Sequence, residues 1–405
     1  MGAAYSAETR EWLAGTDLSE RKSLGQYMTP RPIRDSLIDR LELSPGMRVL
    51  DPGVGTGEFL ASIAEREPSA SLTGWDADPR VLEYAARAVP GAALRHRSAL
   101  DPYDGEPFDL VIGNPPYFQF RATPQERERF RRVISGRPNI FALFFQASVE
   151  ATKPGGRVAF VVPPSMNNGA YFEALRNFLV EAGSIEHLEV LEGNDLFEDA
   201  STAAQLIVIR VGDSGGDFHL RRTCPEAGFS RTIFSTDPAA LEREFEGRET
   251  LWDLGFEAVT GTVVWNQHRE RLVRSEGRGA VPLIWSHNIE SGEVVLATDH
   301  KRPQYVLGQE PLRGPALVVN RVVGAVGRGE LRAALVPEGM EFVAENHVNV
   351  IRARPAVSQR LAWEDLLAAM SSPGIASRVR RLTGNTQISA KELTHLLPLS
   401  SPRRA

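Results

Sequence analysis

The chain has 405 residues, of which 42% are hydrophobic and 24% are charged; this composition excludes a wholly disordered protein and predicts two or three domains. The single cysteine, Cys224, excludes an intramolecular disulfide and a zinc site built from cysteines. No apolar stretch approaches the roughly 18 residues of a membrane helix, and the N-terminus lacks a signal-peptide core, so we expect a cytoplasmic protein with no membrane contact.

The net charge of −6 hides an uneven distribution. Residues 1–217 contain 22 basic and 31 acidic residues, whereas the chain from residue 218 onward contains 24 basic and 21 acidic residues. Nearly all the cations are arginines, whose planar fork suits phosphates and guanine edges, although a codon bias would explain the same preference. The two parts of the chain therefore differ in electrostatic character.

The first half alternates between strand-like and helix-like segments, which is typical of a doubly wound α/β sheet. Its apolar runs predict strands over these segments in chain order: 47–53, 71–79, 108–117, 155–165, 187–193 and 203–211. Helical spacing predicts helices over 58–67, 80–89, 139–152 and 170–183. We expect six or seven strands with helices between them.

A linker is predicted at GDSGGD (212–217), where three glycines and three polar residues end the alternation. We therefore expect one domain over 1–217 and another over 218–405. Beyond the linker the apolar runs are short and irregular, as in VTGTVVW (259–265), VPLIW (281–285), ALVVNRVVGAV (316–326) and HVNVIRA (347–353). This pattern predicts a mixed α+β domain.

The segment DPGVGTGEFL (51–60) follows a predicted strand and opens a helix. Its glycines, Gly53, Gly55 and Gly57, allow the backbone to approach a ligand closely. The spacing is neither the dinucleotide fingerprint nor a P-loop. Because Asp51 precedes the glycines, the segment suits a cationic ligand end such as an amino-acid ammonium; the alternative is a plain tight turn.

A second acidic segment, GWDADP (74–79), ends the next predicted strand. At this place in nucleotide-binding sheets an acid accepts hydrogen bonds from ribose hydroxyls. Asp76 stands 25 residues after Asp51, near the expected spacing. The alternative is that Asp76 or Asp78 caps the following helix, and Asp78 beside Pro79 suits that role.

NPPY (114–117) ends the strand FDLVIG, where open α/β sheets place their ligands. The two prolines fix the backbone, so we expect the Asn114 side chain and the Pro115 carbonyl to point the same way and accept both hydrogens of an exocyclic amine. Tyr117 offers a ring on which a flat heterocycle can stack. The alternative is a Pro-Pro turn with a buried aromatic ring.

Taken in order, these motifs resemble those of the gamma-class N6-adenine DNA methyltransferases. GQYMTP (25–30) is similar to the family's N-terminal cofactor motif, and the segments at 51–60, 74–79 and 114–117 resemble its AdoMet, ribose and catalytic motifs. DLFEDASTAAQLIVIR (195–210) resembles the motif that supplies a second aromatic ring for the extruded base. The resemblance implies a class I AdoMet-dependent, Rossmann-like methyltransferase sheet followed by a target recognition domain.

The resemblance also implies roles for individual residues. The cofactor-binding residues would be Thr29, Pro30, Asp51, Gly53, Gly55, Gly57, Asp76, Ala77, Ser98, Ala99 and Asn114. The catalytic residues would be Asn114, Pro115, Pro116 and Tyr117, with Tyr117 and Phe197 stacking on the target base. The family often has an acid 16 residues before the catalytic Asn; this chain has Ser98 there, so either Ser98 or Asp101 would contact the cofactor adenine.

Segments of the second half resemble the recognition domains of restriction-modification adenine methylases, nearest the PstI type. They are VTGTVVWNQH (259–268), VPLIWSHNI (281–289), ENHVNVIR (345–352) and LTGNTQISAKEL (382–393). Their Asn, Gln, His and Arg side chains suit contacts with base edges and phosphates, although ordinary polar loops have the same composition. Thr386, Gln387 and Lys391 are the candidate DNA contacts.

These features together predict a site-specific DNA methyltransferase that uses S-adenosylmethionine, yields S-adenosylhomocysteine and needs no metal. The expected partner is double-stranded DNA, with any restriction endonuclease encoded separately and the protein acting as a monomer or weak dimer. Two alternatives stay open: a methyltransferase for RNA or a protein glutamine, and a catalytically silent DNA-binding subunit. The long second domain argues against the first, and the intact NPPY argues against the second.

Overall fold

The computed structural model describes residues 4–136, 138–191, 203–212, 216–296, 301–321, 331–383 and 388–400. The chain divides into two compact units, one of residues 1–221 with 232–238 and one of residues 222–231 with 239–405. The points of division fall in or beside a two-stranded sheet of β8 (His219–Cys224) and β9 (Phe229–Phe234). Part of the predicted linker, residues 213–215, lies outside the described residues, so the boundary at 217 stays a prediction.

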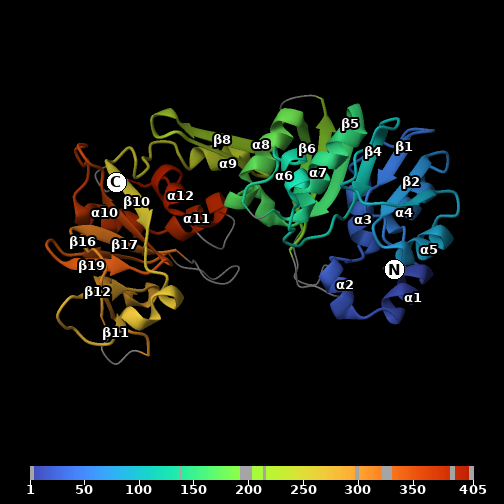
Figure 1. The fold of residues 1–405 in the computed structure, drawn as a ribbon. Coiled ribbons are helices and arrows are strands. Elements are labelled where there is room, and N and C mark those ends of the chain that lie inside the picture. The colour runs from blue at the N-terminus through green and yellow to red at the C-terminus, as the bar shows by residue number, and fades with distance from the viewer. Residues whose placement is uncertain are drawn as a thin grey trace. The chain divides into compact units, whose positions relative to one another are not determined.

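The first unit is built on a seven-stranded sheet (Figure 1). Its strands in chain order are β1 (Arg48–Asp51), β2 (Ser71–Asp76), β3 (Ala93–His96), β4 (Phe108–Gly113), β5 (Thr152–Val162), β6 (Gly183–Val190) and β7 (Gln205–Val211). The spatial order is β3-β2-β1-β4-β5-β7-β6, and all pairs are parallel except those that β7 makes with β5 and β6. The predicted doubly wound α/β sheet is confirmed.

Strand β3 has no counterpart among the six strands located from apolar runs. Its sequence ALRH is short and largely exposed, because it forms the edge of the sheet and pairs only with β2. The apolar pattern that reveals a buried strand is therefore absent, and only its register with Thr73–Asp76 identifies it.

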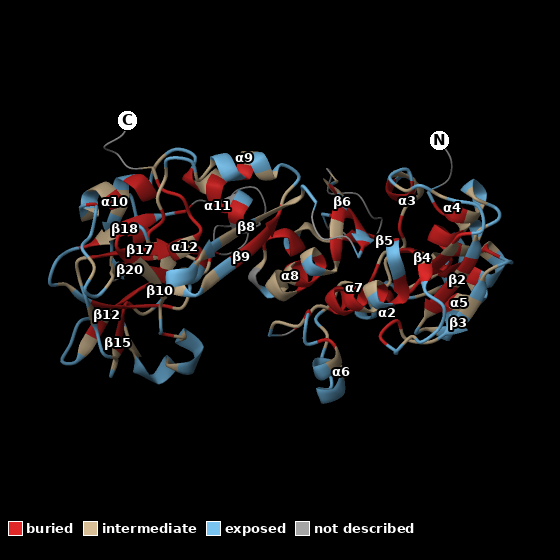
Figure 2. Cartoon of the chain, turned by 90° about the horizontal axis from the view of Figure 1, so that it is seen from above, coloured by how far each residue is buried: buried red, intermediate tan, exposed pale blue. Residues whose placement is uncertain are grey.

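Helices cover both faces of this sheet, which explains why its central strands are continuous apolar runs. On β4, Leu110 and Ile112 pack on the face covered by α3 (Arg31–Ile38) and α4 (Glu58–Arg66). The intervening Val111 packs on the opposite face, against α7 (Ile140–Ala151) and α8 (Glu173–Ala182). Figure 2 shows the buried strands of this sheet in red and the helix α6 (Pro124–Arg129), which has no buried residue, projecting away from them.

The described part of the first unit has three further α-helices. Helices α1 (Ala7–Gly15) and α2 (Leu18–Leu24) precede the sheet, and α5 (Pro79–Ala88) follows β2. Trp12 of α1 packs edge-on against Tyr84 of α5, with ring centroids 5.3 Å apart. The N-terminal segment is thereby attached beside the loops that follow β1 and β2.

The second unit contains two larger sheets, and its mixed α+β character is confirmed. The six-stranded sheet has the order β10 (Phe256–Thr260), β20 (Val348–Ala353), β17 (Ala316–Asn320), β18 (Ala333–Val336), β14 (Gly292–Val294), β13 (Ile289–Glu290). The five-stranded sheet has the order β11 (Leu272–Val273), β15 (Tyr305–Leu307), β12 (Ala280–Ile284), β19 (Glu341–Ala344), β16 (Leu312–Arg313). The α-helices among its described residues are α9 (Pro238–Arg243), α10 (Trp363–Met370), α11 (Ile375–Thr383) and α12 (Ala390–His395); α9 begins at the last residue of the first unit.

Where the structure describes them, the short apolar runs of this half contribute to strands, as their β-branched content indicates. VPLIW and HVNVIRA correspond to β12 and β20. VTGTVVW divides between the end of β10 and an isolated bridge from Val263 to Glu345. Among the described residues, no helix combines the length and the apolar content needed to span a membrane.

Candidate active site

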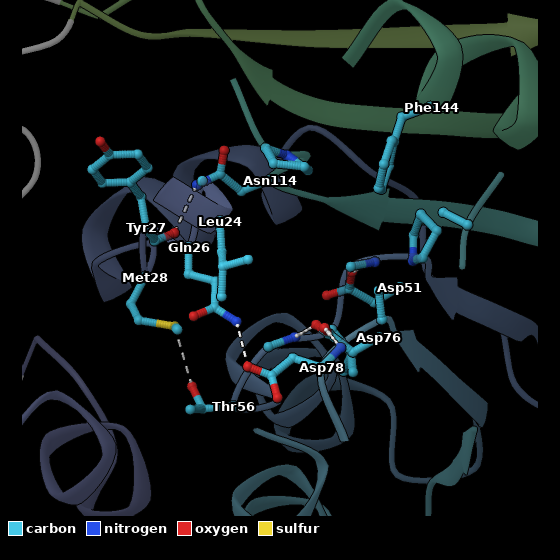
Figure 3. Close-up of a pocket in the computed structure, with 18 of the residues that line it drawn as sticks. Leu24, Gln26, Tyr27, Met28, Asp51, Thr56, Asp76, Asp78, Asn114 and Phe144 are labelled. Atoms are coloured by element: carbon cyan, nitrogen blue, oxygen red, sulfur yellow. Dashed lines mark hydrogen bonds between the residues drawn. The ribbon is translucent and has the colours of Figure 1, made fainter. Parts of the chain in front are cut away.

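A cavity of about 430 Å³ lies at the carboxyl ends of β1, β2 and β4, where the strand order reverses (Figure 3). Cavities of this size at this place in α/β sheets bind small molecules and cofactors. Four predicted motifs contribute to its lining: residues 25–29, 51–56 with 58–59, 76–79 and Asn114. The fold thus brings together segments that are up to about 90 residues apart in the chain.

The loop after β1 shows why its glycines are needed. Gly55 and Gly57 have φ values of +50° and +88°, in the left-handed region that favours glycine. Gly53 and Gly55 line the cavity, whereas Gly57 is outside its lining. A Cβ on Gly57 would lie 3.3 Å from the Cα of Ala85, so this glycine permits close packing of α5.

Asp51 ends β1 and is only 2% exposed. Its Oδ1 accepts a hydrogen bond of 3.1 Å from the backbone N–H of Gly53, and a Cβ on Gly113 would lie 2.8 Å from the same oxygen. Burial raises the pKa of Asp51 to about 8, the Gly53 hydrogen bond opposes this shift, and the Asp76 carboxylate adds to it. A cation placed here would therefore find a buried carboxyl group with no cationic partner among the described residues.

Asp76 ends β2 and holds the neighbouring loops. Its two oxygens accept backbone N–H bonds of 2.9 Å from Gly55 and from Asp78. Burial raises the pKa of Asp76 above its ordinary value, and these hydrogen bonds oppose the shift. Asp76 lines the cavity, as does its neighbour Ala77.

Asp78 is the residue that caps the following helix. It accepts the backbone N–H of Arg80 at 3.0 Å and forms a 2.8 Å ion pair with the Arg80 guanidinium. It also accepts a 3.1 Å bond from the Gln26 side chain, so it joins the N-terminal motif to β2. Asp78 is therefore the residue that caps the helix, and Asp76 does not have that role. Asp76 lines the cavity.

The N-terminal motif forms one wall of the cavity. Thr29 is buried and lines it, whereas Pro30 is the N-cap of α3 and is outside the lining. The Met28 sulfur lies 3.5 Å from the Thr56 hydroxyl. In Figure 3, Met28 and Phe144 stand on different sides of the cavity.

Ser98 and Asp101 have different surroundings. Ser98 and Ala99 line the cavity, whereas Asp101 is exposed and accepts a 3.1 Å hydrogen bond from the Ser98 backbone N–H. Asp101 therefore shapes the turn that presents Ser98.

The NPPY residues follow β4. The Asn114 side-chain amide donates a 3.1 Å bond to the Tyr27 carbonyl, and its Oδ1 accepts a bond from the Tyr117 hydroxyl. The same hydroxyl lies 2.7 Å from the Val161 carbonyl oxygen. Asn114 and Pro116 line the cavity, whereas Pro115, which is buried, and Tyr117 are outside its lining.

The Tyr117 ring is packed rather than free-standing. It meets Phe141 edge-on, with ring centroids 6.2 Å apart, and burial raises the pKa of its hydroxyl above the ordinary value. Tyr117 is therefore a neutral hydrogen-bond donor beside Asn114.

Of the remaining candidates, the structure describes only Lys391. Phe197, Thr386 and Gln387 are outside the described residues, and Lys391 is an exposed residue of α12. In the described part of the chain, no group of three or more His, Cys, Asp or Glu side chains is arranged to hold a metal ion.

The apolar lining of the cavity was not foreseen from the sequence. Much of it comes from Leu24, Met28, Phe118, Ile140 and Phe144. The segment NIFALFFQAS carried a usable signal, because α7 is apolar around most of its circumference. A helix that is apolar on all sides is expected to be buried on all sides, so its sequence does not show which of its residues face a cavity.

Two protein families match the chain. The N-6 DNA Methylase family matches residues 8–73, and the Eco57I restriction-modification methylase family matches residues 84–197. Both matches fall within the first unit and include residues of the cavity.

Curated relatives extend the similarity to the second unit. The type II methyltransferase M.BsuBI of Bacillus subtilis is 23% identical, with 93% of this chain and 87% of the relative covered. M.PstI of Providencia stuartii is 21% identical, with 94% and 88% covered. The modification methylase CviBIII of a Paramecium bursaria Chlorella virus is 27% identical, but the match covers 54% of this chain and 58% of the relative.

Proposed function

We propose that this chain, which belongs to the N6-adenine DNA methyltransferases of type II restriction-modification systems, transfers a methyl group from S-adenosylmethionine to N6 of an adenine in double-stranded DNA. One observation carries the proposal for the site. The cofactor loop, the acid after β2, the N-terminal motif and Asn114 all line a single cavity.

The cavity residues fit S-adenosylmethionine chemically. The buried Asp51 carboxyl suits the ammonium of the methionine end, because a cation would stabilise its ionised form. Asp76 supplies carboxylate oxygens for ribose hydroxyls, and Ser98 with Phe144 offers a polar edge and an apolar surface for the adenine.

The bound cofactor supplies an electrophilic methyl group. The protein has to hold the adenine amine so that its nitrogen lone pair faces that methyl group. Asn114 Oδ1 and the Pro115 carbonyl would accept the two amine hydrogens and share the positive charge that develops on nitrogen as the new N–C bond forms. One N6 proton then leaves to solvent, and S-adenosylhomocysteine remains. Orientation and preorganised dipoles are the main contributions, so no strong base is required.

In the free protein, Asn114 Oδ1 already accepts a hydrogen bond. Since the Tyr117 hydroxyl donates to Asn114 Oδ1, the adenine amine has to replace that hydroxyl. The hydroxyl keeps a second acceptor, the Val161 carbonyl at 2.7 Å, when it leaves Asn114. We therefore propose that base entry transfers the Tyr117 hydrogen bond to Val161 while the ring stacks on the base.

The direct test is to incubate the purified protein with S-adenosylmethionine and unmethylated mixed-sequence DNA, digest the DNA and detect nucleosides by mass spectrometry. We expect N6-methyladenine with the wild-type protein and none above background with Asn114→Ala. Cofactor binding without any methylated DNA base would contradict the proposal and redirect the search to RNA or protein substrates.

Two variants of Tyr117 separate the ring from the hydroxyl. Tyr117→Ala loses stacking worth about 1–3 kcal/mol, so kcat/KM on DNA should fall roughly 5- to 150-fold. Tyr117→Phe keeps the ring and frees Asn114 Oδ1, so its kcat/KM should stay within about threefold of wild type. Equal losses in the two variants, measured by methyl transfer at limiting DNA, would show that the hydroxyl and not stacking dominates.

We further propose that the partner endonuclease is a separate protein. The chain lacks the Pro-Asp of the common nuclease pattern, although Glu20 with Lys22 and Asp299 with Lys301 match its second half. The protein would then act on DNA as a monomer or weak dimer.

A further inference from the structure

The second unit has a concentration of positive charge at one edge of its five-stranded sheet. We define the β11 basic patch as the exposed cations in the segments before and after edge strand β11 and before its partner β15: Arg269, Arg271, Arg274, Arg278, Lys301 and Arg302. The only acidic residues within 265–278 and 301–302 are Glu270 and Glu276. Among the described residues of these segments, six cations thus accompany two carboxylates, in a unit whose overall excess of positive charge is small.

Strand pairing brings these side chains together. Leu272 and Val273 of β11 pair antiparallel with Val306 and Tyr305 of β15. The residues that follow β11 therefore lie near the residues that precede β15. The Arg274 guanidinium donates a 3.3 Å bond to the Lys301 carbonyl. The segment that follows β11 therefore contacts the segment that precedes β15.

Two members of the patch are held by aromatic rings. The Arg269 guanidinium lies 4.9 Å from the ring centroid of Trp265, which is 37% exposed. The Arg302 guanidinium lies 4.9 Å from the ring centroid of the buried Trp285. Ring contacts restrict these guanidinium groups without neutralising them.

The ion pairing of the patch differs from that of several other arginines in the same unit. Those arginines face carboxylates, as in Arg313 with Glu341 at 2.5 Å and Arg352 with Glu257 at 2.8 Å. Within the described residues, by contrast, no ion pair involves Arg269, Arg271, Arg274, Arg278 or Lys301. An alternative role for exposed cations on an edge strand is to prevent edge-to-edge association of sheets. That role requires only a few charges on or next to the strand. Of the six cations, however, only Arg271 and Arg274 adjoin β11.

We propose that the β11 basic patch binds the phosphodiester backbone of the DNA duplex, a proposal that rests on the proposed function and assigns one surface to it. Arginine forks match phosphate oxygens in pairs, and the ring contacts of Arg269 and Arg302 orient two of the forks. Because phosphates carry no sequence information, this surface sets affinity and register for any sequence. Neutralised phosphates release counterions, so the patch makes DNA binding strongly dependent on salt.

The experiment compares two triple variants of the full chain that remove the same charge. The patch variant is Arg271→Gln, Arg274→Gln, Arg278→Gln; the matched control is Arg313→Gln, Arg352→Gln, Arg360→Gln, all at arginines paired with glutamates. Duplex affinity is measured by fluorescence anisotropy over a range of salt concentrations. Each lost phosphate contact should reduce the steepness of log K against log salt by about 0.9, hence by up to about 2.7 in the patch variant and not in the control.

The outcomes separate this proposal from the proposed function. A patch variant with the wild-type salt slope, while the wild-type protein methylates DNA, would overturn the patch assignment and leave edge protection as its role. Equal slope changes in both triple variants would overturn it as well, as would patch-dependent binding that is tighter for an RNA duplex than for DNA. If the wild-type protein neither binds nor methylates DNA, this result would instead contradict the proposed function.

A single substitution tests the patch independently, in case the triple variant does not fold. Arg278 lies in the exposed turn between β11 and β12, so Arg278→Gln should unfold at the wild-type temperature. Its salt slope should fall by about 0.9. An unchanged slope in this variant would count against the patch.

Discussion

At the scale of single residues, the site depends on polar groups held in apolar surroundings. Asp51 is buried against Gly113, and its carboxyl group has no cationic partner among the described residues. A buried carboxyl group without a cation favours its protonated form. The residue is therefore sensitive both to pH and to any cation that enters the cavity.

This sensitivity predicts a pH-dependent stability. The pKa of Asp51 is about 8 in the folded protein and 3.8 in a free carboxyl group, so the folded chain holds a proton that the unfolded chain has lost between these values. The stability that this proton contributes is present below about pH 4 and is lost as the pH rises through about 8. Relative to Asp51→Asn, whose amide stays neutral, the wild-type melting temperature should fall between about pH 5 and about pH 8.

Thermal unfolding of both proteins in cofactor-free buffer checks this expectation. A constant difference in melting temperature across the range would mean that Asp51 is ionised throughout. Calorimetry supplies an independent readout: cofactor binding near neutral pH should release a proton in the wild-type protein that the Asp51→Asn variant does not release.

At the scale of elements, a buried ion pair fixes the cofactor loop against the N-terminal segment. The Arg34 guanidinium of α3 lies 2.6 Å from the Glu58 carboxylate at the start of α4, and both side chains are less than 10% exposed. Glu58 also accepts the Ser6 backbone N–H at 2.8 Å, and Arg34 donates to the Thr29 carbonyl. Three chain segments around the cavity thus meet at one pair of side chains.

Breaking this pair should be costly because one charge would remain buried. Glu58→Gln leaves the Arg34 guanidinium without its counterion, and the free energy of unfolding should fall by about 3–5 kcal/mol. The matched control is Glu65→Gln in the exposed pair with Arg31, where the loss should stay below about 1 kcal/mol. Urea unfolding measures both variants, and similar losses in the two would contradict the assigned importance of burial.

At the scale of the whole molecule, the chain forms two compact units with separate hydrophobic cores. Every residue that lines the cavity belongs to the first unit. The β11 basic patch belongs entirely to the second. The residues proposed for chemistry and for phosphate binding therefore lie in different units.

This division predicts two calorimetric unfolding transitions with different responses to ligand. S-adenosylhomocysteine at about 100 times its Kd should stabilise the first unit by about 2.7 kcal/mol and raise only its transition. Differential scanning calorimetry with and without the ligand checks this. One transition that shifts as a whole would show that the two units unfold cooperatively.

The sequence by itself determined the strand, glycine turn and helix that carry each motif. β1 with its loop and α4, β2 with α5, and β4 with its double proline follow from periodicity and turn chemistry among adjacent residues. The order of the motifs then identified the family. These features are local, so the printed chain contains nearly all the information that specifies them.

Only the tertiary structure decided which residues meet. It brought Gln26 to Asp78 and Tyr27 to Asn114, and it placed Ser98, not Asp101, at the cavity. It also assembled the β11 basic patch from segments that are separate in sequence. Contacts between residues tens of positions apart depend on how apolar faces pack and on which strands pair, and no local pattern encodes either.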